Sequence, residues 1–171
     1  GPYSLVTVLI NTGNDANGTP QFAVTYYYTW VGGQNSLRSL TVGNLNGEAR
    51  PDFIMGDAYG NLQTYLNDGL GNFTAHPSLF NVVPQTGGPS TGPGVIVDLN
   101  GDGKGDFIES SGQAGATNVF LGNGDGTFQA PVVIQLPGRS PGAIAAADLN
   151  NDGKPDFVAA LSDGICSRLL E

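Results

Sequence analysis

Residues 98–106 read DLNGDGKGD, and the same nine-residue pattern recurs as DLNNDGKPD at 148–156 and, less closely, as NLNGEARPD at 44–52. The three copies begin 54 and 50 residues apart, and each is followed at once by Phe and an aliphatic residue. A period of this length is the sequence signature of a repeat architecture, in which each unit stacks on its neighbours.

A second series of landmarks has the same period. In each unit a short apolar stretch runs into a turn rich in Gly, Asn and Asp and then reaches a Phe, at Phe22, Phe73 and Phe128. The best-defined unit divides into four short alternating or apolar stretches, which are 93–99, 106–109, 116–121 and 128–135.

These stretches have the pattern of antiparallel strands, and no segment keeps the spacing of an amphipathic helix over more than one turn. We therefore expect an all-β protein. Four strands in about 50 residues are typical of one blade of a β-propeller, a ring of four-stranded antiparallel sheets. Kelch-like and sandwich arrays have similar spacings, and the spacing alone leaves them open.

The repeats indicate a single repeat domain over residues 1–171, with blade material at 3–43, 44–97, 98–147 and 148–171. We expect the first segment to hold the end of one blade and the start of the next, and the last segment to be incomplete. The chain then contains about three blades' worth of strands. Because propellers close with roughly four to eight blades, this predicts a partial propeller or a ring completed by further chains.

The composition limits the partners. The 171 residues carry 6 Lys and Arg against 15 Asp and Glu, a formal net charge of −9, which disfavours a nucleic-acid partner. Eight of these acids fall in the three nine-residue segments. No apolar run approaches the roughly 18 residues of a membrane-spanning helix, so we expect no membrane span.

The nine-residue segment has the composition of a calcium loop. Oxygen-bearing side chains stand at its first, third, fifth and ninth positions, and Ca²⁺ takes about six to eight oxygen ligands. A Gly after the fifth position allows a sharp turn, and the Lys at the seventh position would bind through its backbone carbonyl. The predicted ligands are Asp98, Asn100, Asp102, Lys104 and Asp106 for one ion, and Asp148, Asn150, Asp152, Lys154 and Asp156 for a second.

The copy at 44–52 is a weaker candidate for a third ion. Its leading Asp is replaced by Asn and its Gly by Ala, and only two acids remain. A plain turn is the alternative for all three segments, because tight turns also favour Asn, Asp and Gly. The residues of this weaker site are Asn44, Asn46, Glu48, Arg50 and Asp52.

The segments DLNGDGKGDFI and DLNNDGKPDFV, each followed by a predicted strand, resemble the FG-GAP or VCBS repeats of integrin α-subunit-type propellers and related propeller lectins. The resemblance covers nearly the whole chain, although the literal FG and GAP words are absent. It implies a propeller with Ca²⁺ between the first two strands of each blade, found in secreted and cell-surface proteins.

We therefore expect a calcium-binding extracellular module for ligand binding or cell adhesion, and not an enzyme, since no G-x-S-x-G, H-E-x-x-H or phosphate-binding Gly-Lys-Ser/Thr motif is present. One alternative is a carbohydrate-binding lectin. Others are a self-assembling filament or surface protein, and the non-catalytic propeller part of a secreted enzyme. The expected partners are Ca²⁺, an extracellular protein or glycan, and further copies that complete the propeller. Three aromatic residues alternate along one predicted strand, and they either bind a ligand or simply pack in the core. They are Tyr26, Tyr28 and Trp30.

Overall fold

The computed structural model describes residues 4–29, 37–76, 91–111, 115–136 and 141–161. These residues form strands and no helix, and so none of them belongs to a helix able to cross a membrane. The strands are β1 (Ser4–Asn14), β2 (Pro20–Thr29), β3 (Leu37–Gly43), β4 (Asp52–Asp57), β5 (Leu62–Asn67), β6 (Phe73–Ala75), β7 (Thr91–Val97), β8 (Asp106–Ser111), β9 (Ala116–Phe120), β10 (Val132–Gln135), β11 (Pro141–Ala147) and β12 (Asp156–Leu161).

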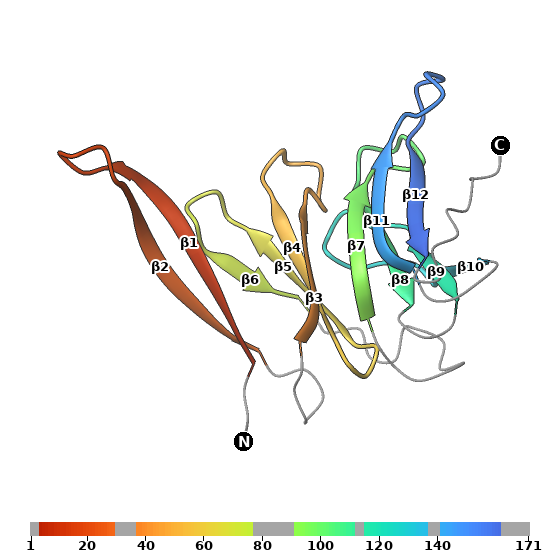
Figure 1. Cartoon of the computed structure of the whole chain (residues 1–171), viewed down its shortest axis with the longest axis horizontal. Helices are drawn as coiled ribbons and strands as arrows, with labels where there is room; N and C mark the ends of the chain where they lie inside the picture. The colour runs from red at the N-terminus through yellow and green to blue at the C-terminus, as the bar shows by residue number, and fades with distance from the viewer. Residues whose placement is uncertain (1–3, 30–36, 77–90, 112–114, 137–140, 162–171) are drawn as a thin grey trace.

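The described strands make four antiparallel sheets. Figure 1 shows β1-β2 at the left, the sheet of β3 to β6 next to it, and the strands of the other two sheets together at the right. Two sheets have four strands, in the orders β3-β4-β5-β6 and β7-β8-β9-β10, and these are the complete blades. The other two are the pairs β1-β2 and β11-β12. Strand β3 contacts β7, and β7 contacts β11, so the first strands of successive units line a common side. The all-β propeller arrangement expected from the repeats is confirmed.

The predicted strands of the second complete blade lie close to the observed ones. Strands β7, β8 and β9 agree with the predicted stretches to within two residues at each end. The fourth predicted stretch, 128–135, begins too early. Phe128 makes only an isolated bridge to Gly122, and β10 begins at Val132.

In the two complete blades, the aromatic residue that follows the nine-residue segment packs between neighbouring sheets. Phe107 is fully buried and stacks on Phe120 at a ring distance of 5.9 Å, against Leu45, Ile54 and Leu62 of the preceding blade. Aromatic side chains supply most of the buried area at such contacts. This cluster therefore joins the two complete blades.

A second cluster joins β1-β2 to the first complete blade. Phe53 stacks on Tyr65 with ring centroids 4.6 Å apart, and Val6 and Met55 complete the buried group. Phe53 and Phe107 occupy the same place in their blades, since Phe53 pairs with Tyr65 as Phe107 pairs with Phe120. The repeat seen in the sequence is thus a repeat of packing.

Candidate metal centre

The three nine-residue segments connect the first strand to the second strand of three successive units. Residues 44–52 link β3 to β4, residues 98–106 link β7 to β8, and residues 148–156 link β11 to β12. Each of these loops joins two antiparallel strands and therefore lies at an end of its sheet. All three loops lie at the top of the molecule in Figure 1. We call them loop 1, loop 2 and loop 3 in chain order.

Loop 2 is closed by backbone N–H groups that donate to its leading carboxylate. Asp98 accepts hydrogen bonds from the N–H groups of Gly101 at 2.8 Å and Gly103 at 2.8 Å. It also accepts one from Asp102 at 3.2 Å. A single carboxylate therefore orders most of the turn.

The third and fifth positions of loop 2 make the same kind of bond two residues ahead. Asn100 Oδ1 accepts from the N–H of Asp102 at 2.9 Å, and Asp102 Oδ1 accepts from the N–H of Lys104 at 3.0 Å. Side-chain oxygens of the first, third and fifth positions are thereby held along one continuous curve of backbone.

Loop 3 repeats this network. Asp148 accepts from the N–H groups of Asp152 at 3.2 Å and Gly153 at 2.9 Å. The third and fifth positions again accept from the N–H two residues ahead, at 2.9 and 2.8 Å. Loops with different residues at the fourth and eighth positions thus fold in the same way.

The backbone conformation explains the residues at the fourth and sixth positions. Gly101 and Gly103 have φ of 75° and 83°, and Asn151 and Gly153 have φ of 62° and 86°. Gly adopts this left-handed region without steric cost, and Asn tolerates it better than most residues. The Gly after the fifth position therefore makes the turn that the sequence predicts.

The aspartate at the ninth position has different partners. Asp106 is fully buried, and its Oδ2 accepts from the Leu99 N–H at 2.9 Å while its Oδ1 accepts from the Gly122 N–H at 2.8 Å. Asp52 makes the matching pair of bonds, at 2.9 Å to Leu45 N–H and 2.8 Å to Asn67 N–H. Asp52 and Asp106 thus tie their loops to the end of the third strand or to the chain just beyond it, a role we call the carboxylate clamp.

The carboxylates at the fifth position favour the ionised form. The N–H of Lys104 lowers the pKa of Asp102, and the N–H of Lys154, followed by the Asn150 amide, lowers the pKa of Asp152. The Lys104 ammonium lies 3.5 Å from Asp102 Oδ2. These acids are therefore charged at neutral pH.

The family model for FG-GAP-like repeats matches residues 44–109 and 98–159. The chain belongs to the FG-GAP-like repeat family. Both matches begin at a nine-residue loop, and together they run from loop 1 into β12. No curated protein matches the chain. The family assignment agrees with the propeller-type arrangement of this FG-GAP chain.

Loop 1 of this FG-GAP chain is held differently. Asn44 Oδ1 accepts from the Gly47 N–H at 2.9 Å, and Asn46 Oδ1 accepts from the Glu48 N–H at 3.1 Å. The Glu48 carboxylate forms an ion pair with Arg50, so it already has a cation beside it. This pairing makes loop 1 a poorer site for a metal than the other two loops.

The predicted ligands of each loop are only partly brought together. Among the described residues of the FG-GAP chain, no three His, Cys, Asp or Glu side chains lie close enough together to hold a metal ion. In loop 2, Asp106 is engaged in its clamp. The donor types nevertheless suit Ca²⁺, because carboxylate and amide oxygens are its preferred ligands. A carboxylate oxygen accepts at about two sites, so an oxygen that holds one N–H keeps a free lone pair.

Of the aromatic residues predicted as a ligand-binding patch, Tyr26 is 56% exposed on the outer face of β2. Trp30 and the side chain of Tyr28 lie outside the described residues. Tyr27 points to the opposite face, where its hydroxyl accepts from the Phe73 N–H at 3.0 Å. The structure therefore places one of the three on a described exposed surface.

Sequence reasoning did not anticipate the carboxylate clamp. The signal was present, because the ninth position is the only one at which all three loops keep an aspartate. Its partner N–H lies 15 or 16 residues farther along the chain, in another hairpin. No local pattern in the loop identifies that partner.

Proposed function

We propose that this FG-GAP chain is a calcium-binding propeller module that acts outside the cell in binding a protein or glycan ligand, and that has no catalytic role. Loops 2 and 3 each bind one Ca²⁺, and loop 1 binds a third ion more weakly. One observation carries the proposal. The two loops hold side-chain oxygens of the first, third and fifth positions in the same hydrogen-bonded arrangement, although their sequences differ at two of nine positions.

The proposed ligands of loop 2 are the side chains of Asp98, Asn100 and Asp102, with the carbonyl of Lys104 and a free lone pair of Asp106. Loop 3 uses the corresponding residues. Three aspartates in nine residues repel one another unless a cation lies among them or their pKa values rise. Ca²⁺ removes this repulsion and holds the loop between two strands, which makes its role structural.

The energetic effect depends on the free ion concentration. An ion that binds only the folded state stabilises it by about 2.7 kcal/mol when present at a hundredfold excess over its dissociation constant. Extracellular calcium modules have dissociation constants of about 10⁻⁴–10⁻³ M, which suits the millimolar Ca²⁺ outside cells. An extracellular location follows from the proposed sites.

Calorimetric titration with Ca²⁺ tests the proposal. Metal-free protein should bind two equivalents in the stronger phase, and Asp98→Ala and Asp148→Ala should each remove one of them. Asp125→Ala is the matched control, because Asp125 is an exposed acid that caps another turn by accepting from the Thr127 N–H at 2.9 Å. Equal stoichiometry in all four proteins, or an unchanged melting temperature on chelation, contradicts the calcium assignment.

The class of ligand needs a separate test. The exposed Tyr26 belongs to a larger apolar surface, and aromatic rings bind both sugars and proteins. A glycan array and a protein pull-down with Ca²⁺-loaded protein, each compared with Tyr26→Ser, distinguish a lectin from a protein-adhesion module. Binding to neither class overturns the ligand-binding proposal and leaves the metal proposal standing.

A further inference from the structure

Loops 1 and 2 are joined through their backbones. The Gly105 N–H, at the eighth position of loop 2, donates a hydrogen bond of 3.2 Å to the carbonyl of Leu45, at the second position of loop 1. Leu45 is almost completely buried, in the same cluster as Phe107 and Ile54. The bond therefore connects the two loops at the place where the two complete blades pack together.

Two glycines allow the loops to approach this closely. A Cβ atom at Gly105 would overlap the carbonyl oxygen of Asn44, and a Cβ atom at Gly47 would lie 2.7 Å from the carbonyl oxygen of Gly103. Both obstacles are backbone atoms, which cannot turn aside as the end of a flexible side chain can. A side chain at either glycine would therefore force the loops apart.

One peptide unit takes part in both loops. The proposed function assigns the Lys104 carbonyl to the ion of loop 2, and the N–H of the same peptide unit, on Gly105, is the group that donates to Leu45. Binding at the carbonyl oxygen draws electron density from the N–H and makes it a stronger donor, because bonded groups in a chain polarise one another. An occupied loop 2 therefore holds loop 1 more firmly.

The bond from loop 2 reaches loop 1 between two of its proposed ligands. Leu45 lies between Asn44 and Asn46, and its own N–H donates to Asp52 Oδ2 at 2.9 Å. The Asn44 side chain accepts from the Gly47 N–H at 2.9 Å, and Gly47 lies against loop 2. The contact with loop 2 therefore positions the part of loop 1 that carries its first and third ligands.

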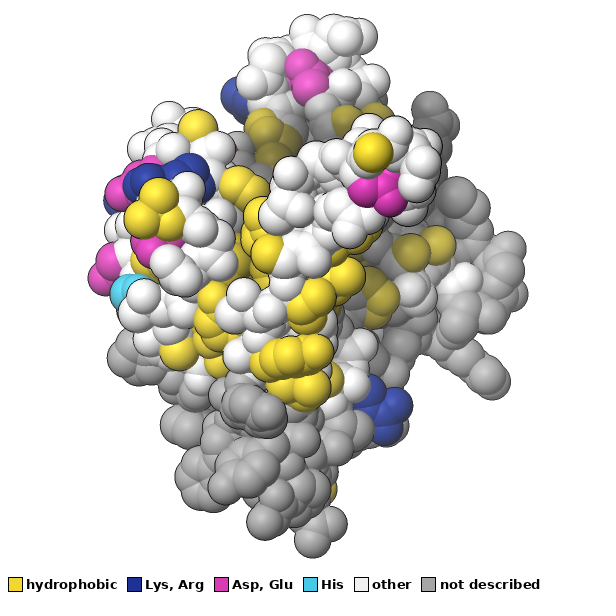
Figure 2. Space-filling model, turned by 90° about the vertical axis from the view of Figure 1, so that its left-hand side faces the viewer, with side chains coloured by type: hydrophobic (Ala, Val, Ile, Leu, Met, Phe, Trp, Pro, Cys, Tyr) yellow, Lys and Arg dark blue, Asp and Glu magenta, His cyan; other side chains and the backbone are white. Residues whose placement is uncertain are grey.

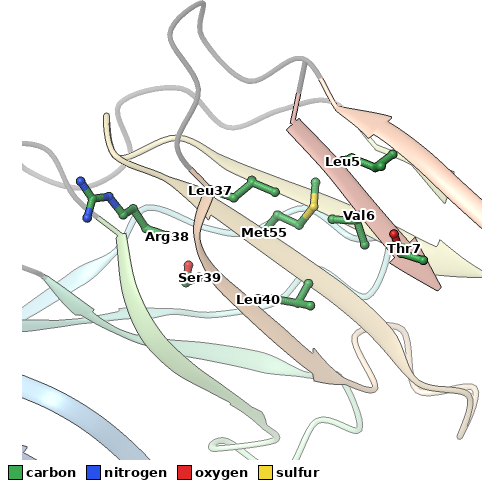
Figure 3. Close-up of a pocket in the computed structure, with 8 residues that line it drawn as sticks. All are labelled: Leu5, Val6, Thr7, Leu37, Arg38, Ser39, Leu40 and Met55. Carbon is green, nitrogen blue, oxygen red and sulfur yellow. The ribbon is translucent and has the colours of Figure 1, made fainter. Parts of the chain in front are cut away.

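The side of loop 1 that faces β1 is less well supported. A groove of about 320 Å³ lies between β1 and β3, and Val6, Leu37 and Met55 line it (Figure 3). Nearer to loop 1, Leu40 and Val42 of β3 are 57% and 64% exposed. Among the described residues no backbone hydrogen bond joins loop 1 to β1, so loop 1 is held by loop 2 and by its own blade.

The short distance between the loops also has an opposing electrostatic effect. Figure 2 shows most of the acidic and basic side chains of its view in the upper half, the end at which Figure 1 places the three loops. Two cations held in neighbouring loops repel each other, and salt screens this repulsion. The hydrogen bond between the loops is a contact of backbone groups and is affected much less by salt. The two effects can therefore be separated by the salt concentration.

Loops 2 and 3 cannot make the same bond. The eighth residue of loop 3 is Pro155, which has no N–H to donate to Leu99, the residue of loop 2 that corresponds to Leu45. Loop 1 also has Pro at its eighth position, Pro51. Of the three loops, loop 2 alone has an eighth residue that can donate, and its acceptor lies in loop 1.

We infer that loops 1 and 2 bind Ca²⁺ with positive cooperativity through the Lys104–Gly105 peptide unit, and that loop 3 has no part in this coupling. The inference rests on the proposed calcium-binding function. An occupied loop 2 fixes the peptide unit and so holds loop 1 in its binding arrangement. By linkage, an occupied loop 1 strengthens binding at loop 2 by the same factor. One intramolecular hydrogen bond corresponds to a factor of about 2 to 12.

Calorimetric titration of metal-free protein with Ca²⁺ tests the coupling. The weaker phase is assigned to loop 1 by its loss in Asn44→Ala. Asp98→Ala, which removes the ion of loop 2, should weaken binding in this phase about 2- to 12-fold. Asp148→Ala, the equivalent change in loop 3, should leave the phase unchanged. The titrations are made in about 1 M KCl, where the Debye length is about 3 Å and the repulsion between neighbouring ions is screened.

Gly105→Ala tests the peptide unit itself. The added methyl group separates the loops and leaves every proposed ligand side chain in place, so binding at loop 1 should weaken by the same factor. In the Gly105→Ala protein, Asp98→Ala should have no further effect on loop 1. Gly142→Ala is the matched control, because the atom nearest to its added methyl group is the Ala160 carbonyl oxygen at 3.9 Å. It should bind Ca²⁺ as the parent does.

The outcomes separate the coupling from the calcium proposal. The coupling is overturned by the absence of a loop 1 phase, by an effect of Asp98→Ala no larger than that of Asp148→Ala, or by a folded Gly105→Ala protein that binds like the parent. Each of these results leaves the calcium sites of loops 2 and 3 standing. If Gly105→Ala does not fold, the comparison of Asp98→Ala with Asp148→Ala decides alone. A parent that binds no Ca²⁺ overturns both proposals.

Discussion

Replacing Glu109 by Gln should make the protein more stable at neutral and alkaline pH and leave it little changed in acid. Glu109 lies in β8 with none of its surface exposed. Its carboxylate accepts from the Gly92 N–H at 3.0 Å and from the Asn118 amide at 3.1 Å. These two bonds do not offset the loss of water around the charge, and burial raises the pKa of Glu109 from 4.5 to about 7.

The sign of the effect follows from proton binding in the two states. Below pH 4.5 both the folded and the unfolded chain keep the proton, so Glu109 adds no pH dependence. Between pH 4.5 and about 7 the unfolded chain releases its proton and the folded chain keeps it, so the free energy of unfolding falls as the pH rises. Above that range the full penalty is present. A difference of about 2.5 pKa units corresponds to about 3 kcal/mol at about 1.36 kcal/mol per unit.

Urea unfolding of parent and Glu109→Gln protein from pH 4 to pH 8 measures this difference. Gln fits the same space and can still pair with Gly92 and Asn118, because an amide both donates and accepts. The variant should gain about 3 kcal/mol over the parent between the two ends of this range. Other carboxylates affect both proteins alike and cancel in the comparison. Parallel curves would refute the reasoning, since they would mean that Glu109 ionises in the folded state as easily as in the unfolded chain.

Two further predictions concern stability and use the same assay. Ala49 has a strained φ of 61° at the sixth position of loop 1, where the other loops have Gly, so Ala49→Gly should raise the free energy of unfolding by about 0.5–1 kcal/mol. Gly103→Ala, at φ of 83°, should lower the free energy of unfolding by about 1–2 kcal/mol. Changes of the same sign at both sites would contradict backbone strain as the cause. Phe107→Ala should lower the free energy of unfolding by about 3–5 kcal/mol, because Phe107 is fully buried between the blades. Leu70→Ala, at a side chain that is 86% exposed, should change the free energy of unfolding by no more than about 0.5 kcal/mol. Similar losses in the two variants would mean that the interface between blades contributes little to stability.

The period and packing of the blades could be predicted from the sequence because each blade repeats the same short-range pattern. Phe53 and Phe107 follow their loops directly, and both pack between sheets as an aromatic residue in an alternating strand should. The loops also lie between first and second strands, where the family resemblance placed the ion sites. These features depend on residues close together in the chain.

The clamp and the buried acid could not be predicted, because they depend on contacts between distant residues. Asp106 Oδ1 accepts from Gly122, 16 residues away in another hairpin. Glu109 occupies the position that Met55 has in the preceding blade and that Ala159 has in β12, so alternation predicts an inward side chain there but gives no reason for a carboxylate. Nor does loop composition indicate that the ninth aspartate prefers backbone N–H groups to the centre of its loop.

The clamp connects each proposed ion site to the outer hairpin of its blade. Asp52 and Asp106 each hold their own loop with one oxygen and the end of the third strand, or the chain just beyond it, with the other, so the shape of the loop and the position of the outer hairpin depend on each other.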